Sequence, residues 1–204
     1  MQVIYIGHAI LLASGLVLFG IGTGTGGGGL LGGLSGSGSS NNQAGAVGKV
    51  AQQAQARVTK NPNDPAAWAA LIQARYENAQ SAGIVNGAFT NFGKQQLALV
   101  ANEYQQYAKL VPKPDVTTAT FAARAYSYLA NYAEEAQVWD QITAQSPTAV
   151  GYKCLAVSAY AAKNTRLAEL AQAKLLSKVP KSQRKTLAAE LQSATTSPKT
   201  AQGC

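Results

Sequence analysis

A recurring proline punctuation between Pro62 and Pro180 constrains the fold of this chain more than any other feature. Between successive prolines lie two alanine-rich segments, each with the three-to-four-residue apolar spacing of an amphipathic helix. The closing prolines Pro112, Pro147 and Pro180 are 35 and 33 residues apart. A period of about 34 residues that contains two helices predicts an all-α solenoid of antiparallel helix pairs.

The third repeat shows the two-helix pattern most completely. Small residues at its positions 8 and 20 would let two antiparallel helices approach closely, and larger residues at positions 4 and 7 would fill the space around them. The first repeat begins at Pro65 with Trp68 at position 4, and the second begins at Asp115 with Phe121 at position 7. With Ala149 as position 1, the third repeat has Tyr152 at 4, Leu155 at 7, Ala156 at 8, Ala168 at 20 and Pro180 at 32.

The first repeat contains an insertion. The interval from Pro62 to Pro112 is 50 residues, about 16 more than the repeat period. Asn86 and Gly87 stand between two short apolar pairs, which predicts a tight hairpin-like turn between the two helices of this repeat. A long helix over 94–110 is expected to follow.

Single helices are expected to close both ends of the stack. Before the first repeat, a helix over 45–60 has an apolar side formed by Val47, Val50, Ala51 and Ala54. After the third repeat, Ser182 is a candidate N-cap for a helix that ends near Ala194. The residues expected to face the stack from this last helix are Leu187, Ala188 and Leu191.

Across residues 45–194 this arrangement resembles the tetratricopeptide repeat (TPR) family. The resemblance implies a short TPR-like solenoid of about three antiparallel helix pairs with capping helices. Two positions depart from the family pattern: Ile72 stands where a small residue is expected, and Thr118 stands where an aromatic residue is expected. The chain as a whole resembles a bacterial-type, single-pass, membrane-anchored member of the family.

The resemblance also implies a site for a protein or peptide ligand, because the first helix of each TPR pair lines a concave groove. Gln73 falls at position 9 of the first repeat and Lys153 at position 5 of the third. Position 12 is a tyrosine in all three repeats, and tyrosine suits a peptide groove. The alternative is that these tyrosines pack between repeats. The candidate partner-binding residues are Gln73, Tyr76, Tyr126, Lys153 and Tyr160.

The N-terminal segment is expected to lie in a membrane. Residues 2–21 contain no Lys, Arg, Asp or Glu, and twenty helical residues at ~1.5 Å each span a bilayer core of ~30 Å. Because no charged side chain precedes Lys49, only the amino terminus informs the orientation, and it favours an extracytoplasmic repeat domain at the cell membrane. The expected organisation is an anchor over 1–21, a Gly/Ser-rich flexible linker over 22–43, the repeat domain over 44–194 and a tail over 195–204.

Positive charge is concentrated in the last quarter of the chain. Up to Tyr152 there are 8 Lys and Arg against 7 Asp and Glu, whereas from Lys153 onward there are 9 against 2. This basic quarter is a candidate surface for anionic lipid or an anionic envelope polymer, and the alternative is an ordinary solvated helical face. Nucleic acid is not an expected partner.

The cysteines and the single histidine leave little room for catalysis. Cys154 and Cys204 form either one disulfide or two unrelated thiols, and their spacing matches no zinc motif. His8 lies in the expected anchor. Because no nucleophile motif, phosphate loop or metal cluster is present in the sequence, we expect no enzymatic activity, no cofactor and no bound metal.

These observations favour a membrane-tethered protein-interaction module that holds a polypeptide partner at the cell envelope. The first alternative is a basic surface that binds anionic lipid or envelope polymer. The second alternative is a structural assembly subunit whose groove is filled by another copy of the chain.

Overall fold

The computed structural model describes residues 40–201 and 204, which belong to one compact unit. The expected anchor over 1–21 lies outside the described residues. Within residues 40–201, no helix is long and apolar enough to span a membrane. The elements are α2 (Ser40–Lys60), α3 (Pro65–Ala82), β1 (Ile84–Val85), β2 (Ala88–Phe89), α4 (Asn91–Leu110), α5 (Val116–Tyr128), α6 (Tyr132–Gln145), α7 (Ala149–Ala161), α8 (Thr165–Ser177), α9 (Lys181–Ser193) and the 3-10 helix η1 (Pro198–Ala201).

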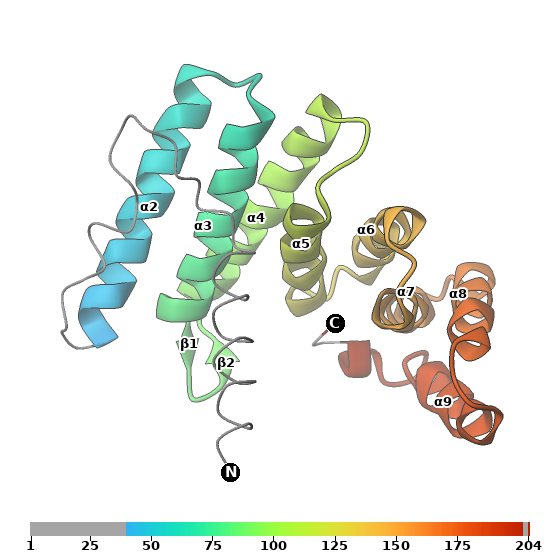
Figure 1. Cartoon of the computed structure of the whole chain (residues 1–204). Coiled ribbons are helices and arrows are strands. Elements are labelled where there is room, and N and C mark those ends of the chain that lie inside the picture. Colours follow the sequence, from blue (N-terminus) through green and yellow to red (C-terminus); the bar gives the residue numbers. More distant parts are fainter. Residues whose placement is uncertain (1–39, 202–203) are drawn as a thin grey trace, which may run out of the picture. The chain divides into compact units, whose positions relative to one another are not determined.

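The helices α2 to α8 pack in chain order, each against the next, and α9 packs on α7 and α8 (Figure 1). The pairs are α3 with α4, α5 with α6, and α7 with α8, while α2 and α9 close the two ends. In addition, α3 contacts α5, so the first helices of the first two pairs are neighbours. This arrangement confirms the prediction of an all-helical stack of sequential helices.

Helix caps explain how the proline punctuation defines the helices. The Asp64 carboxylate accepts a hydrogen bond from the Ala66 amide, and Pro65 occupies the first turn, where its missing N–H costs nothing. Asp115 caps α5 through the Thr118 amide, and Thr148 caps α7 through the Gly151 amide. Each first helix of a pair therefore begins with a side chain that satisfies a free backbone donor.

The turn predicted at Asn86 and Gly87 is confirmed. Strands β1 and β2 pair antiparallel, with Val85 opposite Ala88. Asn86 has φ of 51° and Gly87 has φ of 76°, which are the left-handed values that a two-residue hairpin turn requires. The hairpin, together with the 18-residue α3 and the 20-residue α4, accounts for the long first repeat.

The helix expected over 94–110 begins earlier, at Asn91. Thr90 caps it by accepting a hydrogen bond from the Gly93 amide at 3.2 Å. Gly83, at the end of α3, and Gly93, in the first turn of α4, are in direct backbone contact. A Cβ on either one would lie 2.4 Å from the other. Glycine at both positions lets the chain reverse from α3 through the hairpin into α4.

Alanine dominates the core, as the close approach of paired helices requires. Ala156 and Ala168, at positions 8 and 20 of the third repeat, are fully buried. Ile72, which replaces the expected small residue in the first repeat, is also fully buried. The stack therefore accommodates the larger side chain inside its core.

The capping helices differ from their predicted bounds. Helix α2 begins at Ser40, inside the range 22–43 that was assigned to the linker. The prediction that Ser182 caps the last helix is wrong: α9 begins at Lys181, and its N-cap is Pro180, which makes no side-chain cap hydrogen bond. Pro180 has φ of −56°, which already suits helix entry, so the helix starts one residue earlier. Leu191 is fully buried, as predicted.

The C-terminal tail is fixed on the third repeat. Cys154 in α7 and Cys204 form a disulfide with a Cα–Cα distance of 5.3 Å, and η1 lies beside α7 (Figure 1). Of the two alternatives for the cysteines, the disulfide is therefore confirmed. A structural disulfide is typical of an oxidising compartment.

Candidate functional site

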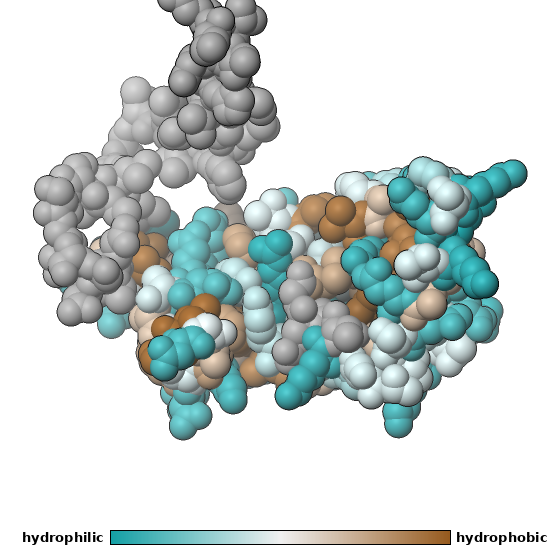
Figure 2. All heavy atoms as spheres, turned by 90° about the horizontal axis from the view of Figure 1, so that it is seen from below, coloured by the Kyte–Doolittle hydropathy of each residue, from teal (hydrophilic) through white to brown (hydrophobic). Residues whose placement is uncertain are grey.

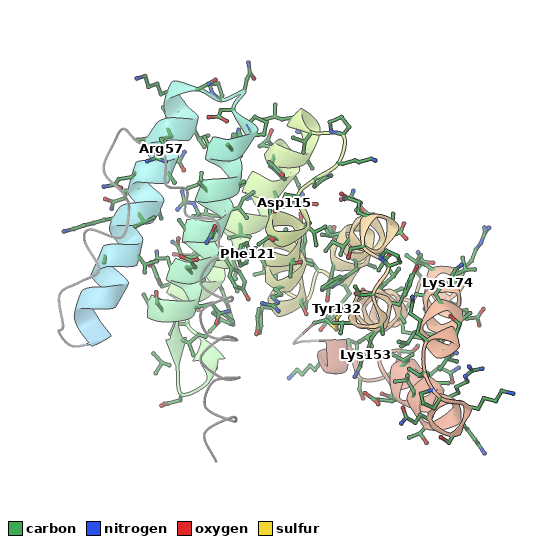
Figure 3. The ribbon with its side chains drawn as sticks, viewed as in Figure 1. Arg57, Asp115, Phe121, Tyr132, Lys153 and Lys174 are labelled. Atoms are coloured by element: carbon green, nitrogen blue, oxygen red, sulfur yellow. A yellow bond between two sulfur atoms is a disulfide. The ribbon has the colours of Figure 1, made fainter. Side chains whose placement is uncertain are left out.

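Two of the five candidate partner-binding residues are exposed. Gln73 in α3 donates a hydrogen bond to the Glu77 carboxylate at 2.8 Å, one helical turn along the chain. Lys153 in α7 lies 3.1 Å from the Glu190 carboxylate in α9 (Figure 3). Both side chains are accessible to a partner, and both form weak surface contacts that a partner could displace.

The three position-12 tyrosines are buried, with exposed fractions of 7% for Tyr76, 3% for Tyr126 and 5% for Tyr160. The Tyr126 hydroxyl donates to the Ala101 carbonyl at 3.2 Å, and the Tyr160 hydroxyl donates to the Gln172 side chain at 3.0 Å. The Tyr126 hydroxyl thus contacts α4 of the preceding repeat, whereas the Tyr160 hydroxyl contacts α8 of its own repeat. Within the described part of the chain, none of the five candidate residues hydrogen-bonds or stacks with another.

Tyr76 borders an open depression between α3 and α5, with a volume of about 390 Å³. The lining residues are Tyr76 and Gln80 from α3 and Arg124 and Tyr128 from α5. The Gln80 side-chain amide donates to the Tyr76 hydroxyl at 3.1 Å, and the Arg124 guanidinium also interacts with this hydroxyl. The depression thus joins the first helices of two successive repeats.

Aromatic contacts hold the two tyrosines in place. The Phe121 ring, on α5 (Figure 3), lies 5.1 Å from the Tyr76 ring. The Phe89 ring from β2 lies 4.6 Å from the Tyr128 ring in an edge-on arrangement. Aromatic rings that meet at an angle, as in these two pairs, attract one another. The inserted hairpin therefore supports one wall of the depression from behind, through the contact of Phe89 with Tyr128.

The depression is positively charged and rich in hydrogen-bond donors. Burial raises the pKa of Tyr76, and the nearby Tyr128 hydroxyl adds to the rise while Arg124 and Gln80 oppose it. The Tyr76 phenol therefore keeps its proton at neutral pH. Among the residues that the structure describes, no carboxylate forms an ion pair with Arg124.

Two glutamates are buried away from this depression. Desolvation raises the pKa of Glu103 to about 7, although the neighbouring Arg75 guanidinium lowers it. Desolvation also raises the pKa of Glu135 to about 8, with Ser127 and Trp139 close enough to offset part of the rise. Both side chains are more than nine-tenths buried. They are part of the packed interior and cannot reach a substrate in bulk solvent.

A second surface feature lies at the C-terminal end of the stack. Leu170 in α8 is 58% exposed, and Arg166 and Lys174 lie one turn before and one turn after it on the same helix face. Lys178 lies over the Tyr152 ring at 5.9 Å from its centroid. Figure 2 shows hydrophilic side chains gathered at this end of the molecule, with small hydrophobic areas between them.

Sequence reasoning identified Tyr76 but missed Gln80, Arg124 and Tyr128. A signal was present, because Arg124 is the only charged residue of α5, a helix that is otherwise composed of small, hydroxylated and aromatic residues. A charged side chain in such a helix indicates a position that faces solvent, and Arg124 is exposed. The repeat pattern alone did not show that it would lie opposite Tyr76.

Comparisons with protein-family models, with curated proteins and with solved structures found no match to this chain. In the described part of the chain, no group of three or more His, Cys, Asp or Glu residues is arranged to hold a metal ion. The candidate site is therefore defined by its own geometry, which is the depression between α3 and α5 together with the exposed side chains on α3 and α7.

Proposed function

We propose that this chain is a non-catalytic, TPR-like protein-interaction module. In this proposal residues 2–21 anchor the chain in the cell membrane, and the helical domain lies on the extracytoplasmic side. A polypeptide partner binds the first-helix surface, by which we mean the solvent-accessible sides of α3, α5 and α7.

The observation that carries the proposal is the depression between α3 and α5, because it is formed by the first helices of two successive repeats. A stack of helix pairs presents an extended surface that suits an extended ligand. Gln73 and Lys153 are exposed on the same set of first helices. The disulfide between Cys154 and Cys204 supports an oxidising, extracytoplasmic location.

Site-specific photo-crosslinking in cells tests the proposal. A photoreactive amino acid would replace Gln73 in α3 or Lys153 in α7, and a matched control would replace Gln106, which is exposed on the second helix α4. We expect both first-helix positions to yield the same crosslinked polypeptide and the α4 position to yield none. Equal crosslinking from all three positions, or none from any, would contradict the proposal. A crosslink to a second copy of the chain would favour the assembly-subunit alternative.

The exposed Leu170 between Arg166 and Lys174 favours a second candidate function, which is binding to anionic lipid. An apolar side chain flanked by basic ones is typical of helices that lie at a membrane interface. Co-sedimentation of residues 40–204 with vesicles tests this candidate. Binding should require phosphatidylglycerol, weaken with added salt, and fall in Leu170→Ser but not in the α4 control Lys109→Gln. Binding to neutral vesicles that resists salt would rule it out.

A further inference from the structure

We propose that the depression lined by Tyr76, Gln80, Arg124 and Tyr128 binds a carboxylate group of the polypeptide partner. This inference rests on the proposed function and deepens it, because it assigns a ligand chemistry to one point of the first-helix surface.

The four side chains present donors to one small volume. The Tyr76 hydroxyl accepts from Gln80 at 3.1 Å and interacts with Arg124, so its own O–H hydrogen is left to donate outward. Tyr128 supplies a second hydroxyl, and the Arg124 guanidinium has further N–H groups to offer. A ligand group that is complementary to these donors must accept several hydrogen bonds, and a carboxylate does so through its two oxygens.

The charge of Arg124 points to an anionic ligand. Two other basic side chains have a carboxylate partner: Arg75 pairs with Glu103, and Lys153 pairs with Glu190. In the described residues Arg124 has no such acidic partner, although it is exposed at the rim of a concave surface. Arginine binds carboxylates through two parallel hydrogen bonds, so this site is complementary in charge and in geometry.

The wall of the depression is held before any ligand arrives. Phe121 packs on Tyr76 at 5.1 Å, and Phe89 packs on Tyr128 at 4.6 Å. Tyr76 is also fixed by its own burial at 7% exposure. Because these donors are already positioned, little side-chain entropy is lost when a carboxylate binds.

The test uses nuclear magnetic resonance on the full chain in detergent micelles, labelled with 15N at the arginine side chains. The chain has five arginines, so the Nε–H spectrum is simple, and the Arg124→Gln variant identifies the Arg124 signal. The five signals are those of Arg57, Arg75, Arg124, Arg166 and Arg184.

The probes are three peptides: N-acetyl-triglycine with a free carboxyl terminus, the same peptide with a terminal amide, and N-acetyl-Gly-Glu-Gly-amide. The second peptide removes the carboxylate, and the third moves it to a side chain.

We expect the Arg124 signal to shift in a saturable way with one or both carboxylate peptides and not with the amide. Arg166, exposed on α8, is the internal control and should not shift in the same titration. Tyr128→Phe removes one donor without changing the ring and should weaken the apparent Kd by about tenfold. The result that would overturn the inference is no shift at Arg124, an equal shift with the amide peptide, or an equal shift at Arg166.

This experiment is separable from the test of the proposed function. Crosslinking of a polypeptide from Gln73 and Lys153, with no carboxylate effect at Arg124, would overturn the carboxylate site and leave the interaction module standing. A carboxylate effect at Arg124, without any crosslinked polypeptide, would instead count against the interaction module.

Discussion

Glu135 should make the domain less stable as pH rises, and Glu135→Gln should remove that effect. Glu135 in α6 is fully buried, and desolvation raises its pKa from 4.5 to about 8. Between these values the folded state keeps a proton that the unfolded state releases. Because the folded state then binds more protons, the free energy of unfolding falls as pH increases through this window.

The size of the effect follows from the pKa difference. Each unit of pKa difference corresponds to about 1.4 kcal/mol. A carboxyl group with a pKa of about 8 in the folded state and 4.5 in the unfolded state therefore lowers the free energy of unfolding by about 3–4 kcal/mol between pH 5 and pH 8. Glutamine has the same shape but no charge to bury. Desolvation also raises the pKa of Glu103 to about 7, so Glu103 also lowers the free energy of unfolding as pH rises. Because both proteins contain Glu103, its contribution cancels when they are compared.

Urea unfolding of residues 40–204, followed by the circular dichroism of the helices, measures this difference. We expect the wild-type free energy of unfolding to fall between pH 5 and pH 8 by about 3–4 kcal/mol more than that of Glu135→Gln. The denaturant dependence should be the same in both proteins, since the surface exposed on unfolding is unchanged. If the two proteins lose stability equally over this range, Glu135 is ionised at no cost in the folded state, and the reasoning fails.

Two further predictions concern stability. The disulfide closes a separation of 50 residues, so Cys204→Ser, or reduction of the wild type, should lower the free energy of unfolding by roughly 4 kcal/mol at most; equal stability of the oxidised and reduced proteins in urea would contradict this. Gly93→Ala should destabilise the domain by about 1–3 kcal/mol, because its Cβ would lie 2.4 Å from the Gly83 carbonyl oxygen. The matched change Gly48→Ala in α2 places a Cβ 3.9 Å from its nearest neighbour, the Asn78 side-chain oxygen of α3, and should instead stabilise by roughly 0.5–1 kcal/mol; thermal melts that show the same shift for both would refute the close-approach argument.

The local elements were predictable because their signals are local. Asn86 and Gly87 adopt positive φ as the turn chemistry requires, and the capping residue Asp115 precedes its helix directly. The small residues Ala156 and Ala168 pack where two helices approach. Each of these depends only on residues nearby in sequence or on the repeat period.

The candidate site was less predictable because it depends on contacts between repeats. Periodicity placed Tyr126 and Tyr160 at position 12 of their helices, but it could not separate a groove position from an adjacent packing position, and both rings are buried. The pairing of Tyr76 with Arg124 depends on how α3 lies against α5. That contact involves the first repeat, whose long helices and hairpin depart from the period.

The start of α2 was missed for a different reason. Ser40 begins a run that contains Ser, Asn and Gly, and these residues have low or moderate helix propensity. Such a composition predicts a linker. Further along the same helix, Ala51, Ala54 and Val58 bury their side chains against the first repeat, and this packing stabilises a helix that propensity alone would not support.

Crosslinking from Gln73 in the Arg124→Gln background tests the central claim most directly, which is that the first-helix surface holds a polypeptide through the depression between α3 and α5. The account predicts a polypeptide crosslink in the wild-type background that falls by about tenfold in Arg124→Gln, while the α8 control Arg166→Gln leaves the crosslink unchanged. A crosslink of equal yield in all three proteins would contradict the claim.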